Sequence, residues 1–323
     1  MFRGLSTPGN AKDIKKEKGQ DKIMKDSLAK KEERFSYIVL VAPALLLYLF
    51  VMAFPVVFSI LLSLSTYRGG RIMDLVNHGF GGLTAYREIF SDQYFYIALK
   101  NNIFIVLISV FGQIPLGFFL AYILSRALIK GTGFFQAMIY LPNVISAVII
   151  GILFNRIFLG SQSLMLEISR RFFDPEAIYI PSSKDMIPVL IVILWMYTGM
   201  YMLIFLANLQ KIDVSIIEAS KIDGASEWQT LRYIIFPILS GVIVTCAILA
   251  ISGSLKSFDL IFIMTEGRPA ESTSVLSIYM YKKAFRQAPD YPVANAISTI
   301  MVIICFILIG LTRFTEKRFS SGE

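Results

Sequence analysis

The chain has 323 residues, of which 55% are hydrophobic and only 17% are charged, and its formal net charge is +8. Soluble globular proteins carry about 25% charged residues, so this composition indicates a protein whose solvent is a lipid bilayer. Ten of the lysines and arginines lie within residues 1–35. A nucleic-acid-binding protein would need its basic residues on a soluble surface, so nucleic acid is not an expected partner.

Residues 1–35 are polar, and the apolar run that follows them is longer than the roughly 7–15 residues of a signal-peptide core. A cleaved secretory signal is therefore not expected. Residues 1–35 are instead predicted to form a basic cytoplasmic tail.

Six stretches are long and apolar enough to cross the hydrocarbon core, which takes about 20 residues. They are residues 36–64, 103–128, 134–159, 187–209, 238–264 and 293–312. The predicted fold is an all-α membrane protein with six transmembrane helices. These helices form a transmembrane domain over residues 36–314, and residues 315–323 are a short cytoplasmic tail.

The distribution of basic residues predicts the orientation of the spans. With the N-terminus inside, 18 of the 31 lysines and arginines lie on the cytoplasmic side, as the positive-inside rule requires. Both termini are then cytoplasmic. The long loops over residues 66–102, 160–186 and 265–292 lie outside, where a partner or substrate could approach. A set of packed caps without a binding role explains these loops equally well.

The sequence contains no set of residues for catalysis, metal binding or nucleotide binding. No Gly-x-x-x-x-Gly-Lys-[Ser/Thr] motif occurs, so no phosphate-binding P-loop is expected. His78 is the single histidine, and Cys246 and Cys305 lie in apolar stretches, where thiols pack as small hydrophobic side chains. We therefore expect that the chain is not an enzyme and has no cofactor of its own. If it works against a gradient, its energy comes from another subunit or from an ion.

The loop of residues 210–236, between the fourth and fifth predicted spans, contains two helical patterns. Ser215 and Glu218 have the spacing of a capping box, which predicts a helix over residues 214–221 with Ser215 as its N-cap. Gly224 then permits a tight turn or a left-handed end to this helix.

Ser226 is the predicted N-cap of a second, amphipathic helix that reaches Ile235, and Pro237 marks the start of the next span. Two short helices joined at a glycine can dock in a groove of another protein and move as a rigid body. Alternatively, they rest on the lipid headgroups. The periodicity favours neither interpretation.

The same loop reads Glu-Ala-Ser-x-x-Asp-Gly-Ala and is followed by Ile-Ile-Phe-Pro. It resembles the coupling loop of permeases in binding-protein-dependent ABC importers, with Ser220 in place of alanine and Phe236 in place of leucine. The resemblance implies contact with a cytoplasmic ATPase, in which Glu218 anchors the helix and Gly224 sets its angle. The implied contact residues are Glu218, Ala219, Ser220, Asp223, Gly224 and Ala225.

Residues 257–269 read Ser-Phe-Asp-Leu-Ile-Phe-Ile-Met-Thr-Glu-Gly-Arg-Pro, and residues 279–285 read Tyr-Met-Tyr-Lys-Lys-Ala-Phe. Both resemble stretches of maltose- and glycerol-phosphate-type sugar permeases, with Arg268 in place of a family glycine. Together with Ala-Pro-Ala-Leu-Leu at residues 42–46 and Leu-Pro at residues 141–142, the resemblance covers nearly everything after residue 35. It is closer to the first of the two permeases in such systems than to the second.

The resemblance also implies a set of partners. These are a second homologous permease, two cytoplasmic ATPase subunits that bind ATP and Mg, an extracytoplasmic solute-binding protein, and the lipid of a bacterial cytoplasmic membrane. The implied function is import of a sugar or oligosaccharide by alternating access.

Ionisable residues inside a span are functional candidates, because each costs at least ~2.5 kcal/mol at mid-bilayer unless it is paired or hydrated. Lys256 and Asp259 are three residues apart on one face of the fifth predicted span. They either neutralise each other or line a hydrated cavity. Ser254 and Ser257 share this spacing, and in the resembled permeases the matching part of the span lines the sugar cavity. A serine that bonds its own helix backbone is the alternative.

The fourth span offers aromatic residues for a sugar. Tyr197 and Tyr201 are one turn apart, and their rings can stack on sugar C–H faces while polar side chains bond the hydroxyls. Trp195 and Tyr197 lie too far inside the span to fit comfortably in an interfacial aromatic belt, which is the alternative interpretation. Asn143 in the third span is a further candidate.

Five cations near the predicted outer mouth favour an acidic glycan, such as a uronate oligosaccharide, over a neutral one. They are Lys256, Arg268, Lys282, Lys283 and Arg286. Two other function classes remain open: an ion-coupled secondary transporter, although the sequence shows no internal repeat, and a membrane receptor or scaffold that transports nothing.

Overall fold

The computed structural model describes residues 37–69, 79–126, 131–158, 164, 167, 186–267, 271–286 and 288–320, with side chains up to residue 314. Among these residues the structure is predominantly helical, and the β contact found is an isolated bridge between Ser65 and Phe80. The predicted all-α fold is therefore confirmed for this part of the chain. The chain divides into two compact units, Met1–Ser59 and Ile60–Glu323.

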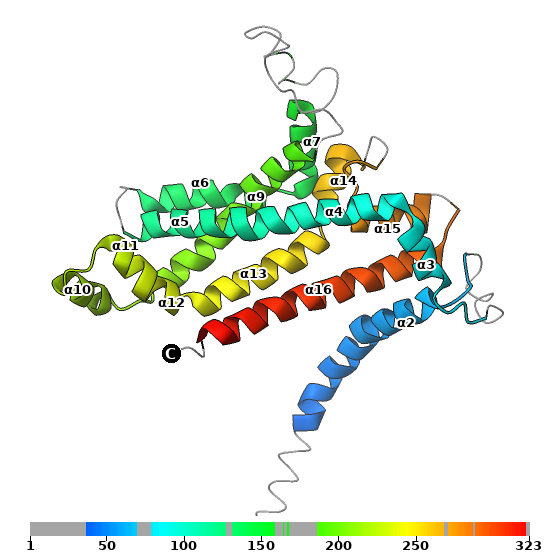
Figure 1. Cartoon of the computed structure of the whole chain (residues 1–323), viewed down its shortest axis with the longest axis horizontal. Helices are drawn as coiled ribbons and strands as arrows, with labels where there is room; N and C mark the ends of the chain where they lie inside the picture. The colour runs from blue at the N-terminus through cyan, green and yellow to red at the C-terminus, as the bar shows by residue number, and fades with distance from the viewer. Residues whose placement is uncertain are drawn as a thin grey trace, which may run out of the picture. The chain divides into compact units, whose positions relative to one another are not determined.

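The first unit contains most of an apolar helix that runs over Tyr37–Ser63 and is long enough to cross a membrane. Within it a π-helical turn, η1 (Leu49–Ala53), precedes α2 (Phe54–Ser63) (Figure 1). The rings of Phe50, Phe54 and Phe58 stack in series at centroid distances of 6.3 and 5.9 Å. Most of its apolar side chains are exposed in the isolated chain, as expected of a surface that faces lipid or another membrane subunit.

In the second unit, α4 (Gln93–Ile108), η3 (Ser109–Gln113) and α5 (Ile114–Ser125) form one continuous helix of 33 residues. Asp92 caps its N-terminus by accepting a hydrogen bond of 2.9 Å from the Tyr94 backbone N–H. The sequence predicted that this span begins only at residue 103, which is ten residues after the actual start of the helix at Gln93. The reason is that Asn101 and Asn102 interrupt the apolar run, whereas in the fold their polar groups bond to other segments.

The third predicted span is a bent pair of helices, α6 (Thr132–Val144) and α7 (Ala147–Phe158), which meet at 91°. Ile145 between them has extended backbone angles, φ −74° and ψ 140°. Pro142 lies in the last turn of α6, and because proline has no N–H it weakens that turn. The single span predicted over residues 134–159 is thus interrupted in its middle.

α9 (Ile187–Leu209) is the most buried of the single-helix candidate spans, and α5 and α6 pack along it (Figure 1). Two glycines make this close packing feasible. A Cβ at Gly117 in α5 would lie 2.8 Å from the Tyr201 Cβ, and a Cβ at Gly199 would lie 2.4 Å from the Ile139 carbonyl oxygen. Small residues at such points let membrane helices approach closely.

The segment after α9 forms α10 (Val214–Ile222), α11 (Glu227–Thr230), η4 (Leu231–Ile235), α12 (Phe236–Ile238) and α13 (Ser240–Leu255). α13 is bent by 67° from the helix that precedes it, so the long apolar helix begins at Ser240 rather than at Pro237 as predicted. Pro237 instead occupies the first turn of α12, a position that needs no backbone N–H.

α13 ends at Leu255, and a separate short helix, α14 (Asp259–Thr265), follows and packs against α7. The continuous fifth span predicted over residues 238–264 is therefore wrong in its second part. Gly253 and Ser254 are weak helix formers, and Phe258 has non-helical angles of φ −136° and ψ −64°. Apolarity alone could not reveal this break.

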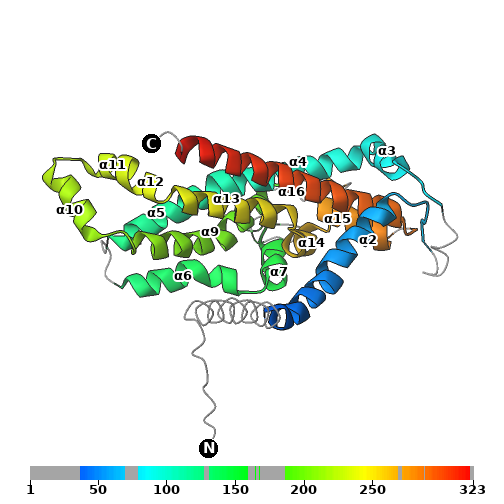
Figure 2. The same ribbon diagram turned by 90° about the horizontal axis from the view of Figure 1, so that it is seen from below.

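The last helix, α16 (Tyr291–Ser320), packs against α13, α15 (Leu276–Tyr281) and α3 (Thr84–Ser91), and Figure 2 shows α13 and α16 side by side. A core of buried apolar side chains joins α3, α4, α15 and α16. The described parts of the predicted loops over residues 66–102 and 265–292 are thus largely helices packed against the spans.

By length and composition, four described helices can cross a membrane, or six if each of the two bent pairs counts as one span. The second count equals the number predicted from the sequence.

Candidate functional site

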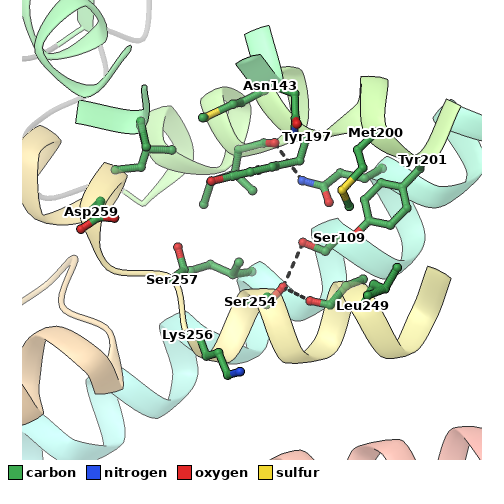
Figure 3. A pocket seen from close by; sticks show the side chains of 18 of the residues that line it. Ser109, Asn143, Tyr197, Met200, Tyr201, Leu249, Ser254, Lys256, Ser257 and Asp259 are labelled. Atoms are coloured by element: carbon green, nitrogen blue, oxygen red, sulfur yellow. Dashed lines mark hydrogen bonds between the residues drawn. The ribbon is translucent and has the colours of Figure 1, made fainter. Parts of the chain in front are cut away.

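A cavity of about 610 Å³ lies where two of the spans are broken and a third contains a π-helical turn. Its walls come from the π-helical turn η3, the break between α6 and α7, the middle of α9, and the break between α13 and α14 (Figure 3). The volume is within the range of small-molecule sites. Within a membrane, irregular backbone is tolerated where it lines such a cavity, because water or a ligand can then satisfy its polar groups.

Seven of the eight predicted substrate-contact residues line this cavity, and one does not. The seven are Asn143, Tyr197, Tyr201, Ser254, Lys256, Ser257 and Asp259. Trp195 lies on another face of α9, where its side chain is 46% exposed and its ring centroid lies 5.3 Å from that of Phe154. Binding by the seven stays a prediction, and the position of Trp195 favours packing and lipid contact.

Ser254 and Ser257 differ in their surroundings. The Ser254 hydroxyl is buried, donates to the Ala250 carbonyl at 2.7 Å and lies 3.1 Å from the Ser109 hydroxyl oxygen (Figure 3). This matches the alternative interpretation, in which a serine bonds its own helix. The Ser257 hydroxyl points into the cavity. Of the two serines, Ser257 is the better placed to reach a ligand.

Lys256 and Asp259 do not share a helical face, contrary to the sequence prediction. Lys256 is the C-cap of α13, and Asp259 is the first residue of α14, because the helix breaks between them. In the described part of the chain the two side chains form no ion pair with each other, and Figure 3 shows them pointing in different directions. Both charges border the cavity, and mutual neutralisation by direct contact is excluded in this structure.

Sequence reasoning missed three polar residues of the cavity wall: Ser146, directly before α7, and the pair Ser109 and Gln113. Both members of the pair are buried, and Gln113 donates from Nε2 to the Ile193 carbonyl of α9 at 2.8 Å. They are the first and last residues of the π-helical turn η3, a feature that often marks functional sites. A glutamine inside an apolar span was the signal that could have singled out Gln113.

In the 210–236 loop, α10 begins one residue before the predicted cap. Its N-cap is Asp213, whose carboxylate accepts a hydrogen bond of 2.9 Å from the Ser215 N–H. The predicted capping box of Ser215 and Glu218 is therefore wrong. Asp213 has extended backbone angles and a carboxylate that favours the helix N-terminus, so Ser215 falls inside the first turn.

The turn between α10 and α11 has the geometry predicted for Gly224. Its φ is +79°, the Gly224 N–H donates to the Lys221 carbonyl at 3.1 Å, and the Ala225 N–H donates to the Ser220 carbonyl at 2.9 Å. These two bonds define a Schellman motif. Ser226 is confirmed as the next N-cap, with a reciprocal capping box to Gln229.

The six residues assigned to ATPase contact occupy different environments. Asp223, Gly224 and Ala225 line a shallow groove of about 320 Å³ together with Tyr233. Glu218 and Ala219 are exposed, whereas Ser220 is buried and its hydroxyl lies 3.1 Å from that of Thr230 in α11. Ser220 thus joins the two short helices internally, and its role as a direct contact stays a prediction.

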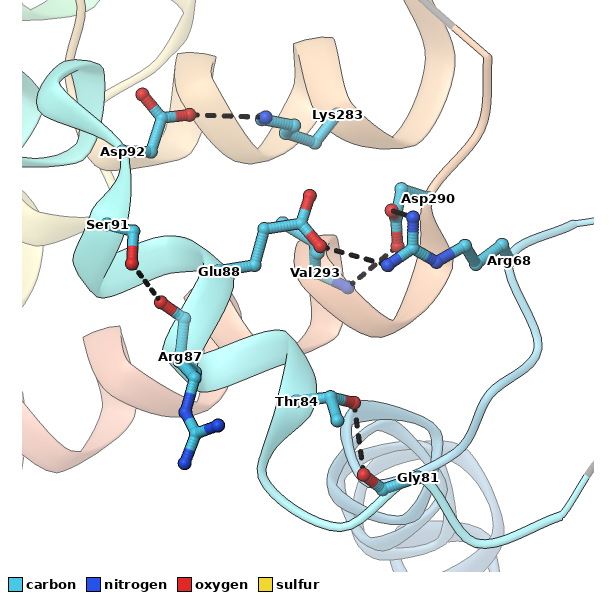
Figure 4. A network of polar contacts seen from close by, with 10 residues as sticks. All are labelled: Arg68, Gly81, Thr84, Arg87, Glu88, Ser91, Asp92, Lys283, Asp290 and Val293. Carbon is cyan, nitrogen blue, oxygen red and sulfur yellow. Dashed lines mark hydrogen bonds and ion pairs between the residues drawn. The ribbon is translucent and has the colours of Figure 1, made fainter.

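Three of the five cations predicted to attract an acidic sugar have carboxylate partners within the chain. Lys282 pairs with Glu271 at 2.6 Å, Lys283 with Asp92 at 3.2 Å, and Arg286 with Glu266 at 3.4 Å. Figure 4 shows the Lys283–Asp92 pair beside the contacts of Arg68. Arg268 lies outside the described residues. Among the cations considered, Lys256 is the one that borders the cavity.

Residues 113–321 match the family model described as binding-protein-dependent transport system inner membrane component. The lactose transport system permease protein LacF of Rhizobium radiobacter is 34% identical over 281 residues, which cover 86% of this chain and 92% of that protein. The probable starch degradation products transport system permease protein AmyD of Thermoanaerobacterium thermosulfurigenes is 28% identical over 305 residues, which cover 90% and 99%.

Two solved structures share the fold. One chain of a bacterial ABC transporter involved in the import of the acidic polysaccharide alginate superposes with a TM-score of 0.73 and 19% identity, over 90% of this chain and 99% of that chain. A chain of the alginate transporter in complex with its alginate pentasaccharide-bound periplasmic protein gives a TM-score of 0.74 and 18% identity, over 90% and 97%.

Proposed function

Since the chain belongs to the family of binding-protein-dependent transport system inner membrane components, we propose that it forms the membrane pathway of an ATP-driven importer of a sugar or oligosaccharide. The relatives are named as lactose and starch-product permeases, which supports a carbohydrate substrate. The family match also removes the ion-coupled secondary transporter and the scaffold from consideration.

The observation that carries this proposal is the composition of the cavity at the two helix breaks and the π-helical turn η3. Hydroxyl and amide groups of Asn143, Ser257 and Gln113 border it together with the rings of Tyr197 and Tyr201. Such a set suits a sugar, since its hydroxyls need hydrogen-bond partners and its C–H faces pack on aromatic rings. Discontinuous helices beside a cavity are also the arrangement by which many transporters bind their substrates.

Transport would proceed by alternating access between this chain and a second permease in the bacterial inner membrane. Two cytoplasmic ATPase subunits, which bind ATP with Mg, would contact the 210–236 loop. The groove at Asp223, Gly224 and Ala225 and the exposed rings of Trp228 and Tyr233 offer the contact surface. A solute-binding protein would deliver the sugar on the opposite side.

An acidic sugar is the finer part of the proposal, and it depends on Lys256. Because the other described cations near the predicted mouth have carboxylate partners, they do not support it. Asp259 borders the same cavity, so one positive and one negative side chain lie at its wall. A neutral oligosaccharide is compatible with this balance, and the substrate class is decided by experiment.

The test is ATP hydrolysis by the complex that co-purifies with this chain, reconstituted in liposomes with its cognate binding protein. Lactose and maltotetraose serve as neutral probes and trigalacturonate as the acidic probe, with the binding protein alone as the control. Stimulation by one probe class identifies the substrate class and supports the importer. A complex without ATPase activity, or one that no carbohydrate stimulates, contradicts the proposal.

A further inference from the structure

Two adjacent asparagines of α4, Asn101 and Asn102, are buried and reach segments that are more than 150 residues away in the sequence. The Asn102 amide donates from Nδ2 to the Ser254 carbonyl at 3.1 Å and accepts at Oδ1 from the Leu276 N–H at 2.8 Å. It therefore bonds the last turn of α13 and the first residue of α15 at once. Both groups belong to helix ends, which lack intrahelical partners.

Further bonds tie the same two regions together. Asn101 donates from Nδ2 to the carbonyls of Ser272 and Ser274 at 2.9 and 2.8 Å. The Ser277 hydroxyl donates to the Ser257 carbonyl at 2.5 Å. The cap segment, defined here as residues 271–286, is thus fixed to α4 and to the end of α13.

The two regions that Asn102 joins have different surroundings. Within the cap segment Lys282 pairs with Glu271, whereas Lys283 pairs with Asp92 at the start of α4. The end of α13 forms part of the cavity wall, where Gly253 and Ser257 lie. A displacement of the cap segment therefore acts on the wall through the buried Asn102 side chain and through the bond from Ser277 to the Ser257 carbonyl.

We propose that Asn102 is a positioning residue that couples the cap segment to the cavity wall. Its amide offers a donor and an acceptor at the same time, which neither leucine nor aspartate can do. A contact that moves the cap segment moves the Ser254 carbonyl, and with it the wall. The coupling itself does not depend on the proposed function. Its purpose does, because it would let a partner bound at the cap segment reshape the sugar cavity.

A thiol reporter in the cavity wall tests this coupling without the need for a substrate. Gly253→Cys is suitable, because a Cβ at Gly253 meets no atom within 4 Å. The native thiols are removed by Cys246→Ala and Cys305→Ser. The complex in liposomes is then labelled with a charged methanethiosulfonate reagent, and the labelling rate is measured with and without Lys283→Gln, which breaks the 3.2 Å pair between the cap segment and Asp92 at the start of α4.

With Asn102 present, we expect Lys283→Gln to change the labelling rate by about threefold or more, the size of a measurable coupling between contacting sites. In the Asn102→Leu background the effect should fall below about twofold, because the bond from Ser277 to the Ser257 carbonyl then remains but the link through Asn102 is lost. If the leucine variant fails to assemble, Asn102→Asp takes its place. Aspartate keeps the size and the acceptor for the Leu276 N–H but lacks the donor to the Ser254 carbonyl, so we expect the same result. Asn208→Leu is the matched control, because the Asn208 amide donates only to Ile204 of its own helix.

An effect of Lys283→Gln that is equal with and without Asn102 overturns the proposal, and so does the absence of any effect in all backgrounds. The labelling requires no transport and no sugar. A complex that imports no carbohydrate can still show the coupling, and an active importer can lack it, so the failure of either proposal is recognised separately.

Discussion

The rings of Phe118 and Phe236 stack with their centroids 4.9 Å apart and their planes 25° from parallel. Phe118 belongs to α5 and also contacts Phe205 of α9 edge-on at 5.4 Å, whereas Phe236 is the last residue of the 210–236 loop. The π-helical turn η4 precedes Phe236 and brings it onto α5. The two short helices of the loop are thus connected to α9, the helix whose tyrosines border the cavity.

Phe236→Leu, which restores the residue that the resembled family has here, should remove the stacking but keep most of the buried apolar area. An aromatic pair contributes about 0.5–1.5 kcal/mol beyond burial, so a small fall in thermal stability of the purified complex is expected. Phe236→Ala should cost about 3 kcal/mol or more. Scanning calorimetry of both variants checks the order, and an alanine variant as stable as the leucine variant would contradict it.

Gly224→Ala should weaken the contact with the ATPase. At φ +79° an alanine costs about 1–2 kcal/mol of backbone strain, and because its Cβ would meet no atom within 4 Å, the strain is the whole direct effect. We expect less ATPase to co-purify and less stimulated hydrolysis per complex.

Gly131→Ala is the control for this prediction, because Gly131 has φ +81° and equally open space, but lies at the start of α6. It should carry the same strain and leave ATPase association intact. If both alanine variants lose the ATPase to the same extent, general destabilisation explains the result, and the loop has no special role.

Ser220→Ala should destabilise the protein although the resembled family carries alanine there. The substitution leaves the buried Thr230 hydroxyl without the partner that lies 3.1 Å away, at a cost of about 1–3 kcal/mol. The double variant Ser220→Ala/Thr230→Val should recover most of the loss, since both polar groups are then absent. Melting temperatures of the three proteins check this, and equal stability of the single and double variants would count against it.

Ionised Asp92 should stabilise the protein, and this stabilisation should be lost at acidic pH. Burial by itself would raise the pKa of this carboxyl, but hydrogen bonds from Tyr279 and the Tyr94 N–H, together with Lys283, lower it below its usual value. Because the folded state favours the carboxylate, the stabilisation is present above the unfolded pKa of about 3.9 and is lost as the pH falls through the lowered value.

The check for Asp92 is a series of melting curves for the native protein and Asp92→Asn. The variant should be less stable at pH 7, and the difference should shrink as the pH falls below about 4. A difference that stays constant over this range would show that the ionised form contributes nothing special.

Lys256→Glu distinguishes an acidic from a neutral substrate. If the substrate is a uronate oligosaccharide, stimulation of ATP hydrolysis by trigalacturonate should fall at least about tenfold, because losing one member of a charged contact costs about 2 kcal/mol or more. Stimulation by a neutral sugar of equal length should change little. Lys100→Gln, at an exposed lysine of α4 away from the cavity, is the control. Equal losses for both sugars would exclude an acidic sugar group as the partner of Lys256.

The sequence by itself determined the features that depend on local composition. Apolar runs of sufficient length mark α9 and α16 as spans because the bilayer requires them, and Gly224 and Ser226 predict the turn between α10 and α11 because few other residues suit those backbone positions. Most of the polar residues of the cavity were also predictable, since polar groups within apolar spans are costly unless they serve a purpose.

Only the tertiary structure decided where the helices break and which polar groups are satisfied. The last turn of α13 is held by another helix, because the Asn102 amide donates a hydrogen bond to the Ser254 carbonyl. Lys256 and Asp259 separate because the helix breaks between them, and Lys283 pairs with Asp92, which is distant in the chain. Such pairings depend on long-range contacts, and a pattern of hydrophobic and polar residues along the chain carries no information about them.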